Sequence, residues 1–551
     1  MIRIKLRRAA DSSLSRTSSL VAAAAGGLLL DMANPGLSWW PLAFPAVALI
    51  LAALWQQRAA WGLLIGAVAG FAFWGPHIFW LTLYLGPVPW GALVVVMTAW
   101  FALFGVLTAI ATRSLARVPM LRIRPGVLLA AQALTVTGLW VLREGVQSTW
   151  PYGGFSWGRV ATSQATGVFA ESVSWIGVAG LTAAIVLSCG LVVASVLNHV
   201  APNRVATAPE GAVSPTRIAA DGAPWKVGVS ATALLLLILA VLPAAPLPET
   251  GALRVAAVQG NSKSGIFDDR ESGDVFRGHA DETARVLDEL EARGESVDLI
   301  VWPENSAEFD LPGTGLRDFE VAALAKRAGA PIVAGSILRD PDGSYTNSAI
   351  VWGPEGDTGQ RYDKRFPVPF AEYMPNRDFF HALAPDLVDL VQLDYTAGTR
   401  SSVLNIETSA GSVAAGLAIC FDITFDRQAV AMIDAGAELL LAPTNNADFG
   451  HTDESVQQLQ IARLRAIETG RALVNISTVG TSEIVAPDGD ALDALTPFTA
   501  ATMLAEVPLV TGRTPALEFG ASISGFWMVL GALGAAWGAI GGYEPRRARK
   551  S

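Results

Sequence analysis

Long apolar segments constrain this chain more than any other feature of its sequence. An α-helix needs roughly 20 apolar residues to cross about 30 Å of hydrocarbon. With 52% hydrophobic and only 16% charged residues, the chain is too apolar for one ordinary soluble domain. The first two segments contain Gly and Pro, so they are either two helices or one kinked unit. We expect about eight transmembrane helices, at about 18–34, 38–56, 59–86, 90–112, 126–144, 167–197, 227–246 and 520–542.

Charge divides the same chain into a basic part and an acidic part. Residues 246–518 hold 20 Lys and Arg against 42 Asp and Glu, whereas the remainder holds 19 against 7. An acidic globular part repels a polyphosphate backbone, so no nucleic-acid partner is expected. The basic part, which contains the apolar segments, is expected to lie in the membrane bilayer.

The positions of the basic residues predict the orientation. Short loops rich in Lys and Arg stay in the cytoplasm. Only Arg143 and Arg159, of the nineteen basic residues outside 246–518, fall near the outer side. We therefore expect a multi-pass protein of the bacterial cytoplasmic (inner) membrane with both termini in the cytoplasm. Its predicted parts are a membrane domain at 1–246 with about seven transmembrane helices, an extracytoplasmic domain at 250–515, a final transmembrane helix at 520–542 and a basic cytoplasmic tail at 543–551.

Short β-rich runs alternate with helical patterns in the acidic part, which indicates a layered α/β domain. Strands are expected at 253–258, 298–302, 331–337, 347–352, 403–406, 412–419, 438–442 and 472–477. Helices are expected between them at about 278–294, 316–328, 426–435 and 453–469.

Three residues whose side chains could take part in catalysis each follow an apolar run, which is where α/β folds place functional groups. They are Glu304, Lys364 and Cys420. Each also has an ordinary explanation, as a surface carboxylate, a solvated loop lysine and a small buried apolar residue. Together they supply a base, a cation for a developing oxyanion and a nucleophile. Trp302 and Pro303 should exclude water from Glu304 and raise its pKa.

The remaining sequence predicts neither a metal nor a cofactor. Its five histidines and two cysteines show no HxxxH or CxxC spacing. No glycine-rich phosphate-binding loop follows a strand-like run. Cys420 is the only cysteine of the acidic part, and Cys189, in an apolar run, is expected to be an ordinary buried thiol.

The motifs around these residues resemble those of the nitrilase or carbon-nitrogen hydrolase superfamily. In chain order they are WPEN, YDKR followed by PFAEYMP, and AICFD. Such a domain between seven preceding spans and one following span resembles the apolipoprotein N-acyltransferase family. The resemblance implies an αββα sandwich in which Cys420 is the nucleophile, Glu304 the general base and Lys364 the group that stabilises the tetrahedral intermediate. It also implies supporting or substrate-binding roles for Glu372, Phe421, Asp422 and Asn446.

Two positions depart from that family pattern. Phe421 and Asp422 stand where a Tyr-Glu pair is common, and Asp448 replaces a frequent tryptophan. The first exchange keeps an aromatic ring and a carboxylate. The second removes a large apolar side chain that could cover an acyl chain.

The resemblance implies transfer of a fatty acyl group from a phospholipid to the N-terminal amine of a diacylglyceryl-cysteine lipoprotein. The reaction would be ping-pong, through a thioester on the cysteine. A membrane-tethered nitrilase-type amidase, with water as the acceptor, is the alternative. A transporter or scaffold that has lost catalysis is a third class, against which the sparse charge of the spans argues.

Two aromatic groups are expected near lipid or substrate. The segment 366–385, beside Lys364, forms either an acyl entrance towards the bilayer or ordinary domain core. Its members considered for this role are Phe366, Phe370, Tyr373, Met374, Phe379 and Phe380. A second group is expected to form an interfacial aromatic belt, and consists of Trp150, Tyr152, Phe155 and Trp157.

Overall fold

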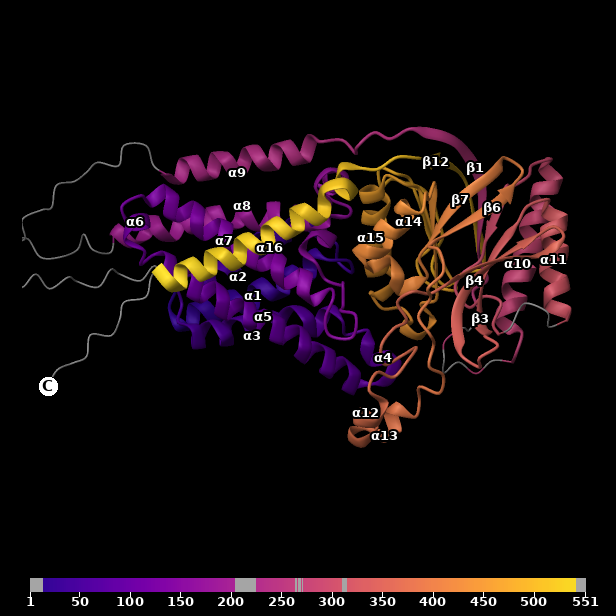
Figure 1. Cartoon of the computed structure of the whole chain (residues 1–551), viewed down its shortest axis with the longest axis horizontal. Helices are drawn as coiled ribbons and strands as arrows, with labels where there is room; N and C mark the ends of the chain where they lie inside the picture. The colour runs from indigo at the N-terminus through magenta and orange to yellow at the C-terminus, as the bar shows by residue number, and fades with distance from the viewer. Residues whose placement is uncertain are drawn as a thin grey trace, which may run out of the picture.

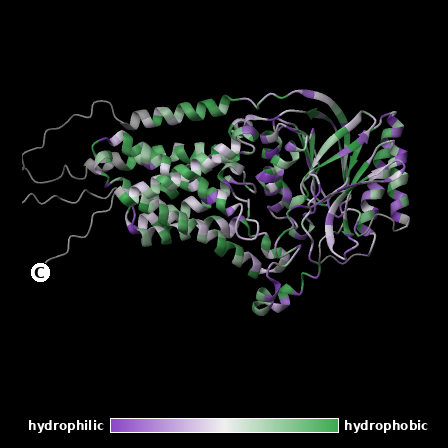
Figure 2. Cartoon of the chain, in the orientation of Figure 1, coloured by the Kyte–Doolittle hydropathy of each residue, from purple (hydrophilic) through white to green (hydrophobic). Residues whose placement is uncertain are grey.

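A computed structural model describes residues 13–203, 224–309 and 315–541, apart from 263, 264, 266–268 and 270. Apolar helices form one end of the molecule, and an α/β domain forms the other (Figure 1). Hydrophobic residues dominate the helical end, whereas hydrophilic residues are frequent on the α/β domain (Figure 2). The basic residues expected before 13, within 204–223 and in the tail 543–551 lie outside the described residues.

Five helices of the described chain are long and apolar enough to cross a membrane. Three further predicted spans coincide with helices that are shorter or less apolar, namely α1 (Arg16–Ala33), α2 (Ala43–Leu54) and α9 (Pro224–Val241). α1 and α2 pack against each other as separate helices, so they are not one kinked unit. The five long helices are α3 (Ala59–His77), α5 (Pro87–Leu115), α7 (Pro125–Gln147), α8 (Val173–Asn203) and α16 (Pro515–Gly541).

The expected span at 59–86 is interrupted. α3 ends at His77, directly after Pro76, and a turn leads into the short helix α4 (Leu81–Leu85). Proline has no backbone N–H for the helical ladder and disrupts the turn around it. Trp80, which follows this break, is buried against the α/β domain, where its indole N–H donates to Gln457.

Glycines bring two pairs of membrane helices into close contact. A Cβ atom on Gly105 of α5 would lie 2.3 Å from the carbonyl oxygen of Gly62 in α3. A Cβ atom on Gly138 of α7 would likewise lie 2.3 Å from the carbonyl oxygen of Trp527 in α16. Small residues let helix backbones approach in lipid, where packing replaces the hydrophobic driving force.

The α/β domain contains two six-stranded sheets. The first has the order β12-β1-β2-β3-β4-β5, and the second has the order β11-β10-β9-β8-β7-β6. The strands of the first sheet are β1 (Glu249–Gln259), β2 (Leu299–Val301), β3 (Ile332–Arg339), β4 (Tyr345–Gly353), β5 (Gly356–Asp363) and β12 (Ala501–Val510). Those of the second are β6 (Val403–Thr408), β7 (Gly411–Leu417), β8 (Leu439–Thr444), β9 (Leu473–Ser477), β10 (Glu483–Val485) and β11 (Ala491–Ala494).

The two sheets pack face to face, and helices cover their outer faces. Alternate residues of both sheets share one buried apolar core. A second core joins the first sheet to α10 (Asp274–Arg293) and α11 (Leu316–Ala328). A third joins the second sheet to α14 (Asp426–Asp434) and α15 (Glu454–Thr469). The layers therefore follow the order α, β, β, α that the family resemblance implied.

All eight expected strands and four expected helices of this domain have counterparts, but β5, β10, β11 and β12 were not expected. β5 is a polar edge strand, β11 is an edge strand of only four largely exposed residues, and β12 contains Pro508. Two short helices, α12 (Arg377–Leu383) and α13 (Pro385–Val388), were not expected either. In the view of Figure 1 they appear at the bottom of the molecule, below α4.

Polar contacts join the membrane helices to the α/β domain through α15 and α14. The Gln457 side-chain oxygen accepts from the indole N–H groups of Trp80 (3.1 Å) and Trp157 (2.7 Å). Arg159 Nη1 lies 2.9 Å from Asp426 Oδ1. Trp157 is buried in this junction, so the expected aromatic belt is wrong for this residue. Trp150, by contrast, is 62% exposed.

The close contact of α7 with α16 leads to a first prediction. Replacement Gly138→Leu should lower the unfolding temperature of the full chain in detergent, because overpacking costs about 1–3 kcal/mol. Gly126→Leu in the same helix is the matched control, since a Cβ atom there meets nothing within 4 Å. Equal unfolding temperatures for the two variants would contradict close packing at Gly138.

Candidate active site

The structure brings Glu304, Lys364 and Cys420 together at one end of the two sheets. Glu304 follows β2, Lys364 follows β5, and Cys420 follows β7 at the start of the 3-10 helix η4 (Cys420–Thr424). Lys364 Nζ lies 2.9 Å from Glu304 Oε1 and 2.9 Å from Glu372 Oε2. Glu304 and Lys364 are both buried, so neither is the surface residue of the ordinary explanation.

Glu304 is held at both carboxylate oxygens. Asn347 Nδ2 donates to its Oε1 (2.7 Å), and the backbone N–H of Asn445 donates to its Oε2 (2.8 Å). Burial raises the pKa of Glu304 above its ordinary value, Lys364 opposes this rise, and Glu372 adds to it. A carboxylate with a raised pKa accepts a proton more readily, as a general base must.

Lys364 remains a cation in this buried place. Burial works against its charge, but the carboxylates of Glu304 and Glu372 outweigh burial and raise its pKa well above the ordinary value. Its ammonium group is fixed between two acceptors. It can therefore stabilise negative charge that develops nearby without first having to be ordered.

Cys420 has an unusual backbone conformation. Its φ angle is +49°, in the left-handed region that non-glycine residues seldom adopt and that often marks functional sites. Its side chain is partly exposed. Burial of the sulfur raises the pKa of the thiol to about 12, Glu304 adds to the rise and Lys364 opposes it. The resting group is thus a neutral thiol, which needs a base before it can attack.

A polar network fixes the other side of the thiol. Gln458 Nε2 of α15 donates to Cys420 Sγ at 3.5 Å. The Gln458 side-chain oxygen accepts from Asn446 Nδ2 (2.8 Å) and Thr444 Oγ1 (3.0 Å). Asn446 Nδ2 also donates to Glu454 Oε2 (2.7 Å). Asn446 is therefore linked to the thiol by way of the Gln458 amide.

Asp422 joins the cysteine turn to the loop that follows Lys364. Its carboxylate accepts from the Tyr362 hydroxyl (2.7 Å) and from the backbone N–H of Phe366 (2.8 Å). It also accepts from the backbone N–H of Ile419 (3.2 Å). Burial raises the pKa of Asp422 to about 6, and Lys364 opposes this rise. Asp422 thus links the cysteine turn to β5 and to the loop after it.

Glu372 contacts Lys364, and Phe421 follows Cys420 in the cysteine turn. Glu372 accepts from Asn347 Nδ2 (2.9 Å) and from the backbone N–H of Val368 (2.7 Å), besides its contact with Lys364. Phe421 stacks against Phe155 of the membrane domain, with ring centroids 6.3 Å apart. Phe155 thus contacts the cysteine turn, which corrects its expected place in an interfacial belt.

A cavity of about 340 Å³ adjoins the cysteine turn and includes part of the aromatic segment 366–385. Phe366 and Tyr373 line it together with Phe421 and Phe425. Other members of the segment pack away from this cavity: Phe370, Met374 and Phe380 form a small cluster with Val388 and Val391. The segment is therefore partly cavity wall and partly local core.

Asp448, which stands where the family pattern frequently has tryptophan, has an aromatic neighbour. Asp448 lies in the 3-10 helix η5 (Ala447–Phe449). The next residue, Phe449, packs edge-to-face on Trp80, with centroids 5.1 Å apart. Aromatic cover on this side of the site is thus supplied by residue 449 and the membrane domain.

Sequence reasoning missed Asn347, Gln458 and Tyr362. Asn347 was assigned to a strand, and Gln458 to a helix, as structural positions only. A buried amide at the start of an apolar strand was the available signal for Asn347, because buried polar groups need partners. No pattern in the sequence indicated that Gln458 would reach a thiol 38 residues away.

A buried Glu-Lys pair beside a cysteine, at the strand ends of an αββα sandwich, defines a nitrilase-like domain. Two family models match the chain. The carbon-nitrogen hydrolase model covers residues 254–514, and the model of the apolipoprotein N-acyltransferase N-terminal domain covers residues 26–191.

Full-length relatives agree with both models. The apolipoprotein N-acyltransferase of Mycolicibacterium smegmatis is 31% identical, over 94% of this chain and 84% of its own length. That of Photobacterium profundum is 26% identical over 91% of each chain. Among solved structures, an amidase from Nesterenkonia sp. is 18% identical and covers 51% of this chain and 99% of its own, with a TM-score of 0.36. The chain belongs to the apolipoprotein N-acyltransferase family.

The network behind Cys420 leads to a prediction about pH. Burial raises the pKa of Glu454 to about 8, so this group is mostly neutral at pH 7 and becomes negative above pH 8. That charge disfavours the Cys420 thiolate, and Glu454→Gln removes it. The ratio of variant to wild-type rate should therefore rise between pH 7 and pH 9 by up to about tenfold, the effect of about 1.4 kcal/mol.

The measurement is the rate of Cys420 acylation by a water-soluble ester across this pH range. Glu483→Gln is the matched control, because Glu483 is also buried but its partner is Arg463. A ratio that is constant with pH would contradict an electrostatic influence of Glu454 on the thiol.

Proposed function

We infer that this chain is an acyltransferase that completes the maturation of bacterial lipoproteins in the inner membrane. It acylates the N-terminal amine of a diacylglyceryl-cysteine lipoprotein. The observation that carries this inference is the similarity to an apolipoprotein N-acyltransferase over 94% of the chain, which includes both the apolar helices and the nitrilase-like domain. Because both the helical part and the nitrilase-like domain of the chain match the same family, they support acyl transfer at a membrane.

The first half-reaction in this proposal forms a thioester. Glu304 takes the proton of the Cys420 thiol, and the sulfur attacks the carbonyl carbon of a phospholipid acyl ester. Lys364 stabilises the oxyanion of the tetrahedral intermediate. The intermediate then expels the glycerol oxygen, which takes the proton from Glu304 and leaves as a lysophospholipid. The buried contact of Lys364 with Glu304 supports these roles.

The second half-reaction releases the acyl group as an amide. The lipoprotein α-amine attacks the thioester carbonyl, and Lys364 again stabilises the oxyanion. Glu304 takes a proton from the attacking amine, collapse of the intermediate breaks the C–S bond, and Glu304 gives that proton to the departing thiolate. Donor and acceptor use the same cysteine in turn, so the scheme is ping-pong.

We propose that the α/β domain at 250–515 lies on the extracytoplasmic side of the membrane. The other parts of this proposed arrangement are a membrane domain at 1–246 with about seven spans, a last span at 520–542 and a cytoplasmic tail at 543–551. The two arginines that fall on the outer side have acidic partners: Arg143 lies 3.0 Å from Glu144, and Arg159 lies 2.9 Å from Asp426. The positive charge of each of these two arginines is therefore balanced by a carboxylate within the chain.

The surroundings of Cys420 favour transfer over hydrolysis. Phe421 and Phe155 stack between the cysteine turn and the membrane domain, and apolar surroundings exclude water from a thioester. The amidase alternative, with water as the acceptor, is therefore not favoured. The site also retains the base, the cation and the nucleophile, which argues against a scaffold without catalysis.

The test is covalent capture of the intermediate. After exposure of the full chain to phospholipid, intact-protein mass spectrometry should show a shift of one fatty acyl group on Cys420. Cys420→Ser should form little or no such adduct, because a hydroxyl is a much weaker nucleophile than a thiol. Cys189→Ser is the matched control and should acylate normally, since Cys189 is buried among membrane helices.

Addition of a diacylglyceryl peptide with a free amine should then discharge the adduct to an amide. Free fatty acid as the main product would support the amidase alternative. An active wild-type protein that shows no adduct would contradict the thioester scheme.

A further inference from the structure

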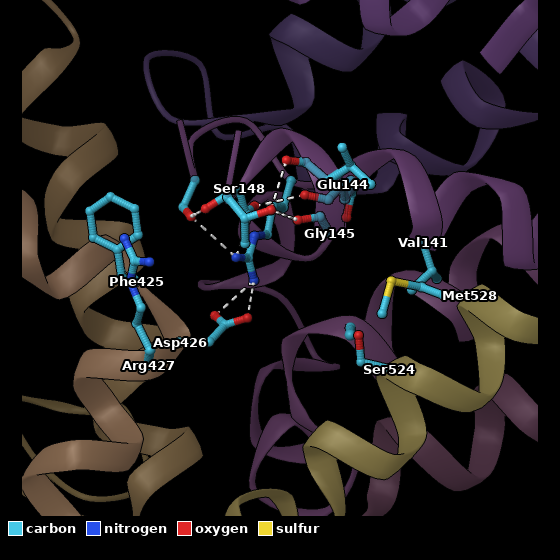
Figure 3. A pocket seen from close by; sticks show the side chains of 14 residues that line it. Val141, Glu144, Gly145, Ser148, Phe425, Asp426, Arg427, Ser524 and Met528 are labelled. Carbon is cyan, nitrogen blue, oxygen red and sulfur yellow. Dashed lines mark hydrogen bonds and ion pairs between the residues drawn. The ribbon is translucent and has the colours of Figure 1, made fainter. Parts of the chain in front are cut away.

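Two neighbouring cavities lie beside the cysteine turn. The first, of about 360 Å³, lies between α7, α16 and the start of α14 (Figure 3). The second is the cavity of about 340 Å³ that Phe421 lines. Phe425 and Arg427 belong to the walls of both. Arg427 therefore marks the junction between a space among the membrane helices and a space that Phe421, the neighbour of Cys420, lines.

The first cavity follows from the way α7 and α16 cross. Their backbones touch at Gly138 and Gly531. Nearer the α/β domain, Gly145 of α7 and Ser524 of α16 face the cavity (Figure 3). α16 is also the least buried of the five long helices, and Phe526 on it is 60% exposed. The cavity thus adjoins the helix with the most surface available to lipid.

The carboxylates around the first cavity already have cationic partners. Asp426 contacts both Arg159 and Arg465, and Glu144 contacts Arg143. Their negative charge is balanced within the protein. Hydroxyl groups complete much of the polar wall, from Ser148, Thr149, Ser156 and Ser524.

Arg427 differs from these arginines. Its guanidinium carbon lies 4.1 Å from the ring centroid of Phe366 and 4.8 Å from that of Phe425. One of its nitrogens donates to the carbonyl oxygen of Gly153 (3.4 Å). Within the described part of the chain, no carboxylate lies at ion-pair distance from it. The two rings hold the guanidinium group in place while leaving it able to accept an anion.

A second arginine faces the same cavity. Arg365 lines the second cavity with Arg427, and its Nη1 donates to Ser402 Oγ (2.7 Å). Burial and Arg365 both lower the pKa of Arg427, and Asp422 opposes them. Asp422 is the carboxylate whose charge acts on Arg427. It already accepts hydrogen bonds from the Tyr362 hydroxyl and from backbone N–H groups. The remaining titratable groups of the wall are the phenols of Tyr152, Tyr373 and Tyr395.

We propose that Arg427, together with Arg365, binds the phosphate of the phospholipid acyl donor at the junction of the two cavities. This site rests on the proposed function. Guanidinium groups match phosphate oxygens with two parallel hydrogen bonds. The phosphate and the acyl esters of a phospholipid share one glycerol unit, so a phosphate at Arg427 places an ester towards Phe421 and Cys420. The cavity between α7 and α16 supplies the way in from the bilayer.

The test compares two acyl donors on the full chain in detergent. One is a diacyl phosphoglyceride, and the other is a fatty acyl p-nitrophenyl ester, which has no phosphate. Arg427→Gln should raise the phospholipid concentration for half-maximal Cys420 acylation by about tenfold, the effect of one lost charge-assisted contact. Acylation by the p-nitrophenyl ester should stay within about twofold of wild type. Arg427→Lys should show a smaller rise for phospholipid, because it keeps the charge but loses the planar fork.

Two further variants separate charge from space. Ser524→Leu should fill the first cavity and impair the phospholipid reaction selectively while every arginine remains. Arg327→Gln is the matched control, since Arg327 pairs with Glu291 and Asp288 on the outer α layer, and it should change neither reaction. An equal loss with both donors in Arg427→Gln, or no loss with either, would overturn the phosphate site.

A binding measurement separates this site from the proposed reaction. Phospholipid retained by the unreactive Cys420→Ala protein is counted by native mass spectrometry, with and without Arg427→Gln. If Arg427→Gln abolishes the retention of phospholipid, the phosphate site is supported, whether or not the wild type forms a thioester. Absence of the thioester would refute only the proposed function. Inorganic phosphate is the second probe: if it binds through Arg427 while phospholipid retention does not depend on that residue, the site serves a soluble anion and the proposal fails.

Discussion

The buried ammonium group of Lys364, held 2.9 Å from each of two carboxylates, is the interaction on which the rest of the site depends. An isolated charge in such a place would cost several kcal/mol, and a pair is tolerated only when its geometry and remaining hydrogen bonds are nearly complete. Asn347 donates to both carboxylates at once, which completes those bonds. Glu304 follows β2, and both Lys364 and Glu372 follow β5 in the same sheet. The Asn445 N–H that binds Glu304 follows β8 in the other sheet, so the two packed sheets must hold these strand ends rigidly. The site thus needs the sandwich, because a looser scaffold would leave one of the charges buried and unpaired.

Much of this arrangement could be predicted from the sequence, for physical reasons that differ from part to part. In the apolar central strands and the amphipathic helices α10 and α15, the local spacing of hydrophobic residues predicts which faces are buried. Glu304, Lys364 and Cys420 each end or follow such a run, and the motifs around them match a known family. The edge strand β5 escaped prediction because its residues are mostly polar and its place is set by pairing with β4. Gln458 escaped because its contact with Cys420 arises only when α15 packs on the second sheet. The helix count of the membrane domain also remains a prediction, since α1, α2 and α9 are short or weakly apolar.

The contact between the two halves of the molecule is polar and aromatic, and this affects how the loop at 150–157 is understood. From the sequence, its aromatic residues resembled an interfacial belt. In the structure, Trp157 is buried against Gln457 and Phe155 stacks on Phe421. The same residue types suit both places, because an indole or a phenyl ring offers a large apolar surface with few rotatable bonds. Only the packing of α15 against the membrane helices separates the two interpretations.

Gln457 and Gln458 are neighbours on α15, yet they bind opposite partners. Gln457 accepts from two tryptophans of the membrane domain, and Gln458 donates to the Cys420 sulfur. The same helical turn is therefore both the attachment to the membrane domain and the support of the nucleophile. An α/β domain cut free of its helices would lose an anchor next to the residue that holds its thiol. Such a fragment would differ from a soluble amidase in an essential respect, because the membrane domain is part of the scaffold that shapes the reacting group.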